Sequence, residues 1–376
     1  MSRGTDETEG KESLPPAYAA GLAALGRATL QTLDALEVGQ RRVLPGRVES
    51  MRERLGPLAQ RLATALSEFR NLRVPDGLES FHAELADAAA AGLTAVTLIV
   101  EPSSPEQRVP RFLRSMREHC RAQELLYPLR GALPPFARYF VESAFHDRLA
   151  DLDPEPPDGM SVGLHRARAG SERDGRGGFS LYVPEHLDPG GSAPLVVALH
   201  GGFGSGRDFL WTWLREARGR GFLLLAPTSQ KNTWALESPA LETRRLHSML
   251  KYVCEHWPVD RRQILLTGLS DGATFTLLAG LGPDSPFTAL APVSGVLHPA
   301  NFANGNLGRA HGRRIYLVHG ALDWMFPVEL ARMARDALDE AGADLTYREI
   351  ADLSHAYPRE ENGRILTWFD PALALA

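Results

Sequence analysis

The sequence predicts an α/β fold, with about eight mostly parallel strands in one sheet and helices on both faces, preceded by an all-helical N-terminal domain. Up to about residue 152, apolar residues recur at steps of three and four, the spacing of one buried helix face. Beyond it, short β-rich runs alternate with helical ones, which is typical of a parallel sheet covered by helices. Since a domain commonly has ~100–200 residues, we expect the 376 residues to form two domains.

The N-terminal part is expected to begin with a disordered tail, residues 1–16, which offers almost nothing apolar to bury. The helical domain follows over residues 17–152, with prolines at the predicted helix ends. The acidic, proline-rich segment 153–159 is interpreted as the domain linker. Helices are predicted at about 17–38, 55–69, 78–96, 105–122 and 133–150.

The C-terminal domain, residues 160–376, contains the β-rich runs. The first two flank a glycine-rich turn, which predicts an antiparallel hairpin at one edge of the sheet. Strands are predicted at 160–168, 179–183, 195–199, 222–225, 263–267, 288–293, 314–318 and 345–350. Helices are predicted at about 206–219, 240–256, 271–281, 328–341 and 359–370.

The composition excludes several classes of protein. Hydrophobic residues make up 44% and charged residues 23%, which is ordinary for a globular protein with a sizeable core. No run approaches the ~18 consecutive apolar residues of a membrane span, and the polar N-terminus lacks the apolar region of a secretory signal. Cys120 and Cys254 are too few for a disulfide framework. We therefore expect a cytoplasmic protein without integral membrane association.

The charge gives no reason to expect a nucleic acid or an anionic membrane as partner, because the net charge is −5. Among the 41 basic residues the lysines are few, namely Lys11, Lys231 and Lys251. Such an arginine bias usually reflects a GC-rich genome and hints at a bacterial source.

Two serines lie in a Gly-x-Ser-x-Gly motif, Ser161 and Ser270. A nucleophilic serine of this motif needs a strand before it and a helix after it, because the sharp turn between them lifts the hydroxyl above the sheet. Ser270 follows the strand-like QILLTG and precedes the helix-like DGATFTLLAGL. Ser161 follows the linker and precedes no helix, so its match is interpreted as a coincidence.

A serine nucleophile also needs a general base and an acid that orients it. Asp323 follows the predicted strand 314–318, and His355 follows the predicted strand 345–350. The carboxyl ends of parallel strands meet at one edge of a sheet, where ligands bind in open α/β folds. We therefore expect Ser270, Asp323 and His355 to act together, with Asp352 as the rival acid.

A glycine-rich turn, His200-Gly201-Gly202-Phe203-Gly204-Ser205-Gly206, follows the predicted strand 195–199. Its backbone N–H groups can point at a developing oxyanion without clashes from Cβ atoms. The predicted oxyanion donors are the N–H groups of Gly202, with Phe203 as the alternative, and of Asp271. The turn lacks the spacing of a dinucleotide-binding loop and the lysine of a Walker A loop.

Four segments, LVVALHGG, GLSDG, VHGALDWMFP and the late His355, together resemble the α/β-hydrolase superfamily over about residues 160–376. More narrowly, they look like its phospholipase/carboxylesterase branch, which includes acyl-protein thioesterases and dienelactone hydrolase relatives. The resemblance implies a cofactor-free hydrolase with a triad of Ser270, Asp323 and His355. Asp271 departs from the glutamine that many thioesterases of this branch carry, which weakens the case for a thioester substrate.

The expected function is therefore hydrolysis of small-molecule carboxylic esters through an acyl-enzyme intermediate, with no cofactor and no metal. A thioesterase or a peptidase on the same triad is the alternative, and a partner-binding protein with a vestigial hydrolase domain is the alternative of another class. Trp234 and Trp324 are predicted to bind substrate, and His200 and His319 to brace loops. The helical domain is expected either to narrow access to Ser270 or to serve oligomerisation or partner binding.

Overall fold

The computed structural model describes residues 14–41, 48–155, 161–167, 176–188 and 190–375. The chain divides into two compact units: a helical unit, Met1–Leu36 and Ser50–Ala132, and a sheet unit, Glu37–Glu49 and Leu133–Ala376. This division lies earlier in the chain than the linker predicted at 153–159. Most of the predicted tail and most of the predicted linker lie outside the described residues.

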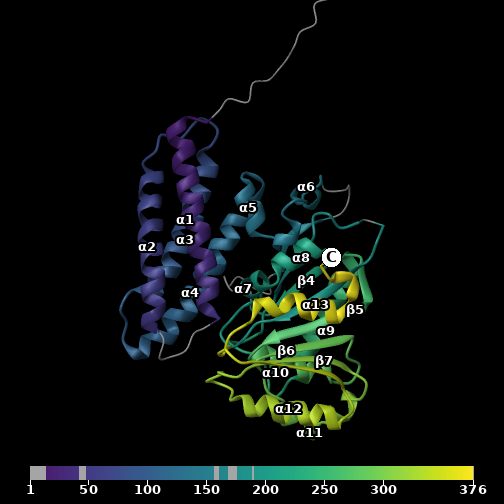
Figure 1. Cartoon of the computed structure of the whole chain (residues 1–376). Helices are drawn as coiled ribbons and strands as arrows, with labels where there is room; N and C mark the ends of the chain where they lie inside the picture. The colour runs from purple at the N-terminus through teal and green to yellow at the C-terminus, as the bar shows by residue number, and fades with distance from the viewer. Residues whose placement is uncertain (1–13, 42–47, 156–160, 168–175, 189, 376) are drawn as a thin grey trace, which may run out of the picture. The chain divides into compact units, whose positions relative to one another are not determined.

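The helical unit is formed by four long helices (Figure 1). The third helix contacts the three others, because a Cβ atom on its Gly92 would lie within 4 Å of Leu33, Leu62 and Ala122. The apolar faces predicted from the periodicity thus pack on one another. The helices are α1 (Pro16–Gln40), α2 (Val48–Arg70), α3 (Glu79–Val100) and α4 (Pro105–Leu126), followed by the short η1 (Tyr127–Gly131).

Helix α3 is long and apolar enough, by length and composition alone, to cross a membrane. Half of its most apolar stretch is buried inside the structure, and Leu85, Ala95 and Val96 are fully enclosed. The packing of these side chains against neighbouring helices accounts for the buried half of this apolar stretch.

The sheet unit contains one eight-stranded sheet in the order β1-β2-β4-β3-β5-β6-β7-β8. The strand β2 is antiparallel to β1 and to β4, and all other neighbours are parallel. This arrangement confirms the predicted α/β-hydrolase fold class, including the hairpin at one edge. The strands are β1 (Gly163–Ala167), β2 (Phe179–Val183), β3 (Ala193–Leu199), β4 (Leu223–Pro227), β5 (Val259–Leu269), β6 (Ala289–Val293), β7 (Arg314–Gly320) and β8 (Asp344–Ile350).

The helices of the sheet unit lie mainly between these strands, as βαβ connections require. The longer ones are α8 (Leu214–Arg220), α9 (Ala240–His256), α10 (Asp271–Gly280), α12 (Val328–Glu340) and α13 (Asn362–Phe369). The short ones are α5 (Pro134–Tyr139), η2 (Ser143–Phe145), α6 (Leu149–Leu152), α7 (Gly206–Phe209), η3 (Leu210–Thr212), α11 (Ala300–Ala303), η4 (Leu307–Ala310), η5 (Arg359–Glu361) and η6 (Pro371–Leu373).

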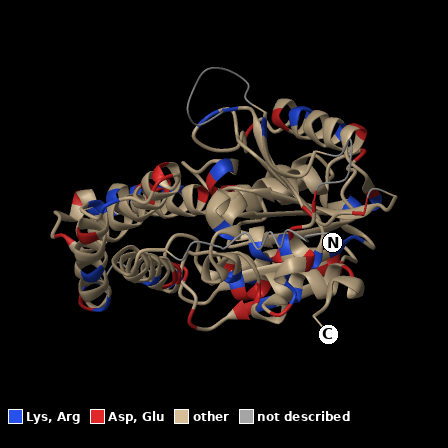
Figure 2. Ribbon diagram, turned by 90° about the horizontal axis from the view of Figure 1, so that it is seen from above, with Lys and Arg blue, Asp and Glu red and all other residues tan. Residues whose placement is uncertain are grey.

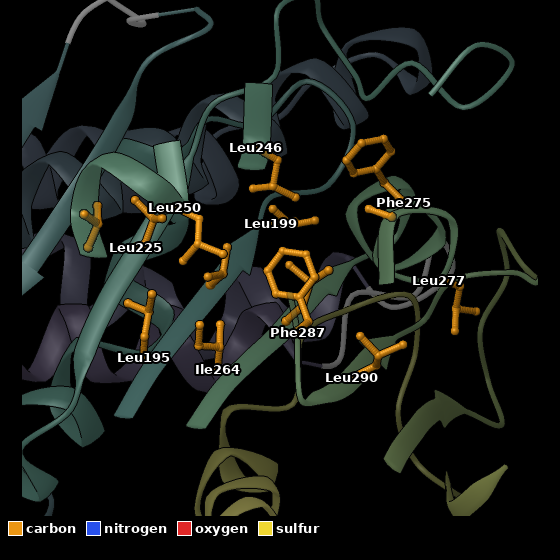
Figure 3. Close-up of a cluster of buried hydrophobic side chains, with 14 of the residues drawn as sticks. Leu195, Leu199, Leu225, Leu246, Leu250, Ile264, Phe275, Leu277, Phe287 and Leu290 are labelled. Carbon is orange, nitrogen blue, oxygen red and sulfur yellow. The ribbon is translucent and has the colours of Figure 1, made fainter. Parts of the chain in front are cut away.

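Both faces of the sheet are covered, because successive side chains of a strand point to opposite faces. On one face, Leu195 and Leu199 of β3 join a buried cluster with Leu246 of α9 (Figure 3). The same cluster contains side chains from α10 and α12. On the opposite face, Tyr316 of β7 packs against Trp368 of α13, with ring centroids 5.4 Å apart.

The segment predicted as one helix at 133–150 forms three short helices instead, and it belongs to the sheet unit. Glu142 bonds to Arg220 at the end of α8, with distances of 2.5 and 2.7 Å. The ring of Phe145 lies against Gly219, where a Cβ atom would come within 2.6 Å of it. These contacts with α8 outweigh the local helical propensity that the sequence shows.

Acidic and basic residues are interspersed along the elements drawn in Figure 2. One ion pair joins an enclosed arginine to a partly exposed aspartate. The side chain of Arg218 on α8 is 0% exposed. Its guanidinium donates to both carboxylate oxygens of Asp153, at 3.1 and 2.7 Å. This pair attaches the end of the 133–155 segment to α8.

Replacing Asp153 with alanine is expected to lower the free energy of unfolding by about 3 kcal/mol, because it leaves a buried guanidinium without its bidentate partner. Urea unfolding of the full-length chain measures the effect. The matched control is Asp151→Ala, which removes a pair with Arg148 whose side chains are 65% and 62% exposed. The control should cost less than ~1 kcal/mol, and equal losses in both variants would contradict the structural role of Asp153.

Candidate active site

Ser270 occupies a sharp turn between β5 and α10. Its backbone has φ 57° and ψ −120°, and L residues rarely adopt a positive φ. A Cβ atom on Gly268 would lie 2.6 Å from the backbone of Gly272, and one on Gly272 would lie 2.5 Å from the carbonyl oxygens of Leu199 and His200. Both glycines are therefore required for strand, helix and β3 to approach this closely.

The structure brings Ser270, His355 and Asp323 together from the carboxyl ends of β5, β8 and β7. His355 Nε2 lies 3.0 Å from Ser270 Oγ, and His355 Nδ1 lies 2.8 Å from Asp323 Oδ2. Since the carboxylate only accepts, Nδ1 carries a proton and Nε2 of the neutral ring is free to accept from the serine hydroxyl. The serine, base and acid predicted from the sequence thus form one hydrogen-bonded chain.

The carboxylate of Asp323 is enclosed, with its side chain 0% exposed. Its Oδ1 accepts from the backbone N–H groups of Met325 at 2.9 Å and Phe326 at 2.8 Å. Burial acts to raise the pKa of Asp323, but the bonds from His355 and from these two amides outweigh it and hold the pKa below its usual range. The group is therefore ionised where it orients the imidazole.

His319 braces the loop that carries Asp323. Its buried ring lies with Nε2 2.8 Å from the carbonyl oxygen of Phe326 and 3.4 Å from Asp323 Oδ2. Because both neighbours accept, Nε2 carries the proton. The ring closes the turn from residue 319 to residue 326 around the carboxylate, the role expected from the sequence.

Neither alternative residue is brought to this site. Ser161 is exposed just before β1, and its carbonyl accepts from the indole N–H of Trp257 at 2.8 Å. Asp352, the rival acid, pairs with Arg41 of the same compact unit at 2.7 Å, and its side chain is 57% exposed. Ser270 and Asp323, and neither alternative residue, are thus hydrogen-bonded to His355.

The glycine-rich segment 200–204 follows β3 and lies beside the Ser270 turn. A Cβ atom on Gly201 would be 3.4 Å from Ser270 Cβ, and one on Gly202 would be 2.8 Å from Asp271 Oδ2. Asp271 is the first residue of α10, where a backbone N–H has no acceptor within the helix. The backbones of Gly202 and Asp271 are therefore close to the serine, as an oxyanion hole requires.

Phe203, the alternative donor to Gly202, is engaged elsewhere. Its backbone N–H donates to the carbonyl oxygen of Asn232 at 2.5 Å, and its φ of 60° turns the chain away from an extended course. The prediction of Phe203 as an alternative oxyanion donor is therefore wrong, because an N–H bonded to a carbonyl is not available to a substrate oxygen.

Trp234, predicted to bind substrate, lies in the core instead. Its side chain is 3% exposed, and its ring stacks on Phe275 with centroids 5.0 Å apart. The indole N–H donates to the carbonyl oxygen of His200 at 2.8 Å. The prediction for Trp234 is wrong because the apolar ring packs on α10 and the indole N–H bonds to the glycine-rich segment.

His200 is a second buried bracing histidine. Its Nε2 accepts from the backbone N–H of Ser229 at 3.0 Å, so the ring is neutral with its proton on Nδ1, which donates to Gly201 O at 2.7 Å. Burial, with the charge of Arg176 adding to it, lowers the pKa of His200 to about 4.

The free energy of unfolding is therefore expected to fall as the pH drops from ~6.5 towards 4. An unfolded histidine titrates near ~6.5, so in this interval the unfolded chain binds a proton that folded His200 does not. The resulting loss is roughly 3 kcal/mol. Urea unfolding at several pH values, for wild type and for His200→Asn, measures it. The variant should lack this part of the pH dependence, and parallel curves would rule out His200 as its origin.

Aromatic side chains surround the imidazole of His355. Phe326 meets it edge-on with centroids 5.3 Å apart, and Trp324 does so at 6.3 Å. Trp324 and Met325 are 43% and 46% exposed. Trp324, unlike Trp234, thus lies on the accessible side of the site, where a substrate group can contact it.

Within the described ranges, no group of three or more His, Cys, Asp or Glu side chains is placed to hold a metal ion.

Residues 240–370 match the family described as Phospholipase/Carboxylesterase, which confirms the resemblance over this range. The matched range contains Ser270, Asp323 and His355 but not the glycine-rich segment 200–204.

An acetylxylan esterase of Coprinopsis cinerea is 31% identical over 120 residues, which are 28% of this chain and 31% of the relative. The chain thus matches about a third of the length of this curated relative. Among solved structures, an acetyl xylan esterase from Aspergillus awamori has a TM-score of 0.43 at 17% identity, covering 55% of this chain and 98% of that one. An S-formylglutathione hydrolase from Staphylococcus aureus has a TM-score of 0.45 at 15% identity, covering 57% and 99%.

Proposed function

We propose that this chain is a serine esterase that cleaves carboxylic esters through an acyl-enzyme intermediate. The observation that carries the proposal is the hydrogen-bonded chain from Ser270 through His355 to Asp323, with the serine on a strained turn. The family match over residues 240–370 and the acetylxylan esterase relative support an ester as substrate.

In the first half-reaction, Ser270 Oγ attacks the ester carbonyl carbon while His355 Nε2 takes the hydroxyl proton. The carbonyl oxygen becomes an oxyanion, which accepts from the backbone N–H groups of Gly202 and Asp271. The tetrahedral intermediate then collapses. The bond to the alcohol oxygen breaks, that oxygen receives the proton from His355, and the acyl group remains on Ser270.

In the second half-reaction, a water molecule takes the place of the alcohol. His355 removes a proton from the water, the resulting hydroxide attacks the acyl-enzyme carbonyl, and the oxyanion forms again in the same place. Collapse returns the proton to Ser270 Oγ and releases the carboxylic acid. Throughout, ionised Asp323 keeps the proton on Nδ1 of His355 and stabilises the imidazolium that forms in each half-reaction.

Labelling with a fluorophosphonate probe tests this proposal, since the probe reacts covalently only with an activated serine. The full-length chain should be labelled stoichiometrically at Ser270, and labelling should compete with p-nitrophenyl acetate. Rates on matched acetyl ester, acetyl thioester and acetyl anilide substrates then decide between esterase, thioesterase and peptidase. A folded chain that the probe does not label is the vestigial domain of the alternative hypothesis.

Trp324 is proposed to contact the apolar part of the substrate. Trp324→Ala should raise KM for an ester with an aromatic alcohol roughly tenfold, equivalent to about 1.4 kcal/mol of lost contact, with little change in kcat. Steady-state kinetics measure this. Met333→Ala on α12, whose side chain is 67% exposed, is the control, and a KM increase of similar size in both variants would count against the contact.

A further inference from the structure

The segment 228–235 after β4, which we call the β4 loop, holds one end of the glycine-rich segment 200–204. The N–H of Ser229 donates to His200 Nε2 at 3.0 Å, and the indole N–H of Trp234 donates to His200 O at 2.8 Å. These bonds fix both the ring and the carbonyl of the residue that begins the segment. The β4 loop thereby sets where the glycines start.

The β4 loop also bonds to Phe203, which follows Gly202, and to Asp271. The carbonyl oxygen of Asn232 accepts from the N–H of Phe203 at 2.5 Å, next to Gly202. The hydroxyl of Thr233 donates to the carboxylate of Asp271, the residue after the nucleophile. One loop is therefore bonded to both segments whose N–H groups are proposed to bind the oxyanion.

Glu242, in the first turn of α9, binds two backbone N–H groups of the β4 loop. Its side chain is buried, with 5% of the residue exposed. Oε1 accepts from the N–H of Gln230 at 2.9 Å, and Oε2 accepts from the N–H of Ala235 at 2.5 Å. Hydrogen bonds to an ionised acceptor are about twice as strong as neutral ones, and a carboxylate is favoured at a helix N-terminus.

The two hydrogen bonds of Glu242 lie on either side of the middle of the β4 loop. The two amides that Glu242 binds precede and follow residues 232 to 234, which are three of the four loop residues that bond to the oxyanion segments. Ser229 is the fourth. Arg176 also binds the loop, since its Nη1 donates to Lys231 O at 2.9 Å and to Gly204 O at 3.0 Å. Two charged side chains thus hold the β4 loop, while residues 232 to 234 contact the segments proposed to form the oxyanion hole.

We propose that Glu242 is a positioning residue for the oxyanion hole. It acts through the β4 loop, which keeps the N–H groups of Gly202 and Asp271 aimed at one point beside Ser270. The proposal rests on the ester hydrolysis proposed above. A misplaced donor weakens binding of the transition state more than binding of the substrate, because the oxyanion exists only in the former.

The test is Glu242→Gln in the full-length chain. Glutamine has the same shape but places an NH₂ group against one of the two backbone N–H groups. The kcat for p-nitrophenyl acetate should fall roughly 10- to 100-fold, as small misplacements of catalytic groups do, with KM changed less than about threefold. The affinity for a trifluoromethyl ketone, which forms an oxyanion on the serine, should fall by the same factor as kcat.

Glu185→Gln is the matched control, because Glu185 is also a buried acid, with 7% exposed, and accepts from Tyr182 Oη at 2.5 Å. It should lose stability while keeping kcat. Trp234→Phe is a second probe, since it keeps an aromatic ring against Phe275 and removes the indole N–H that bonds to His200. Its kcat and ketone affinity should fall together by several-fold. If Glu242→Gln does not fold, Trp234→Phe tests the proposal in its place.

The outcomes separate the two proposals. A wild-type chain without hydrolase activity overturns the proposed function, and this inference with it. An active wild type with Glu242→Gln that loses only thermal stability, as Glu185→Gln does, overturns the positioning role alone. Parallel losses of kcat and ketone affinity in Glu242→Gln and Trp234→Phe, absent from Glu185→Gln, support it.

Discussion

Replacing Ser270 with alanine is expected to lower kcat for ester hydrolysis by roughly 10⁶-fold, the effect that loss of the nucleophile has in other serine hydrolases. The hydroxyl that accepts the acyl group is removed, and neither His355 nor the backbone donors can replace it. Fluorophosphonate labelling should disappear in the same variant. Circular dichroism and thermal unfolding should show an intact fold, because only one oxygen atom is lost.

The matched variant is Ser161→Ala, at the other serine in the same sequence motif. Its exposed position before β1 gives it no part in the chemistry, so its kinetics should equal those of the wild type. Loss of activity in Ser161→Ala, together with retained activity in Ser270→Ala, would show that the nucleophile is Ser161 and not Ser270.

Replacing Asp323 with asparagine is expected to lower kcat on the order of 10⁴-fold, as in other triads. The amide lacks the charge that stabilises the imidazolium. It can also present its NH₂ group to Nδ1, which favours the tautomer with the proton on Nε2, where it blocks acceptance from the Ser270 hydroxyl. Steady-state kinetics should show this loss mainly in kcat.

Asp352→Asn is the control for the acid. Its carboxylate pairs with Arg41 on the surface, so kcat should change less than about twofold and stability by less than ~1 kcal/mol. A larger loss of kcat in Asp352→Asn than in Asp323→Asn would move the acid to Asp352.

The sequence was sufficient to predict the three residues that the structure joins by hydrogen bonds. Each follows a β-rich run, and parallel strands bring their carboxyl ends to one edge whatever lies between them. The position of Gly202 could be predicted for the same reason, since it follows a strand of the same sheet. Local patterns were enough here because the sheet itself supplies the long-range geometry.

Other features depend on contacts that no local pattern contains. Trp234 follows the fourth strand as a pocket residue would, but its burial depends on Phe275, a distant residue in the chain. The helical periodicity of 133–150 does not reveal the contacts with α8 that break it. Glu242 looks like an ordinary acid in the first turn of a helix, because the two amides it binds lie in an irregular loop.

At position 270, thermal stability and catalysis favour different residues, because the backbone there has a positive φ. A non-glycine residue held in such a conformation costs about 1–3 kcal/mol, and glycine would relieve most of it. Selection for heat resistance alone would therefore favour glycine at position 270 and discard the nucleophile. In directed evolution of this chain, position 270 is best kept fixed, and gains in stability sought where the backbone is relaxed.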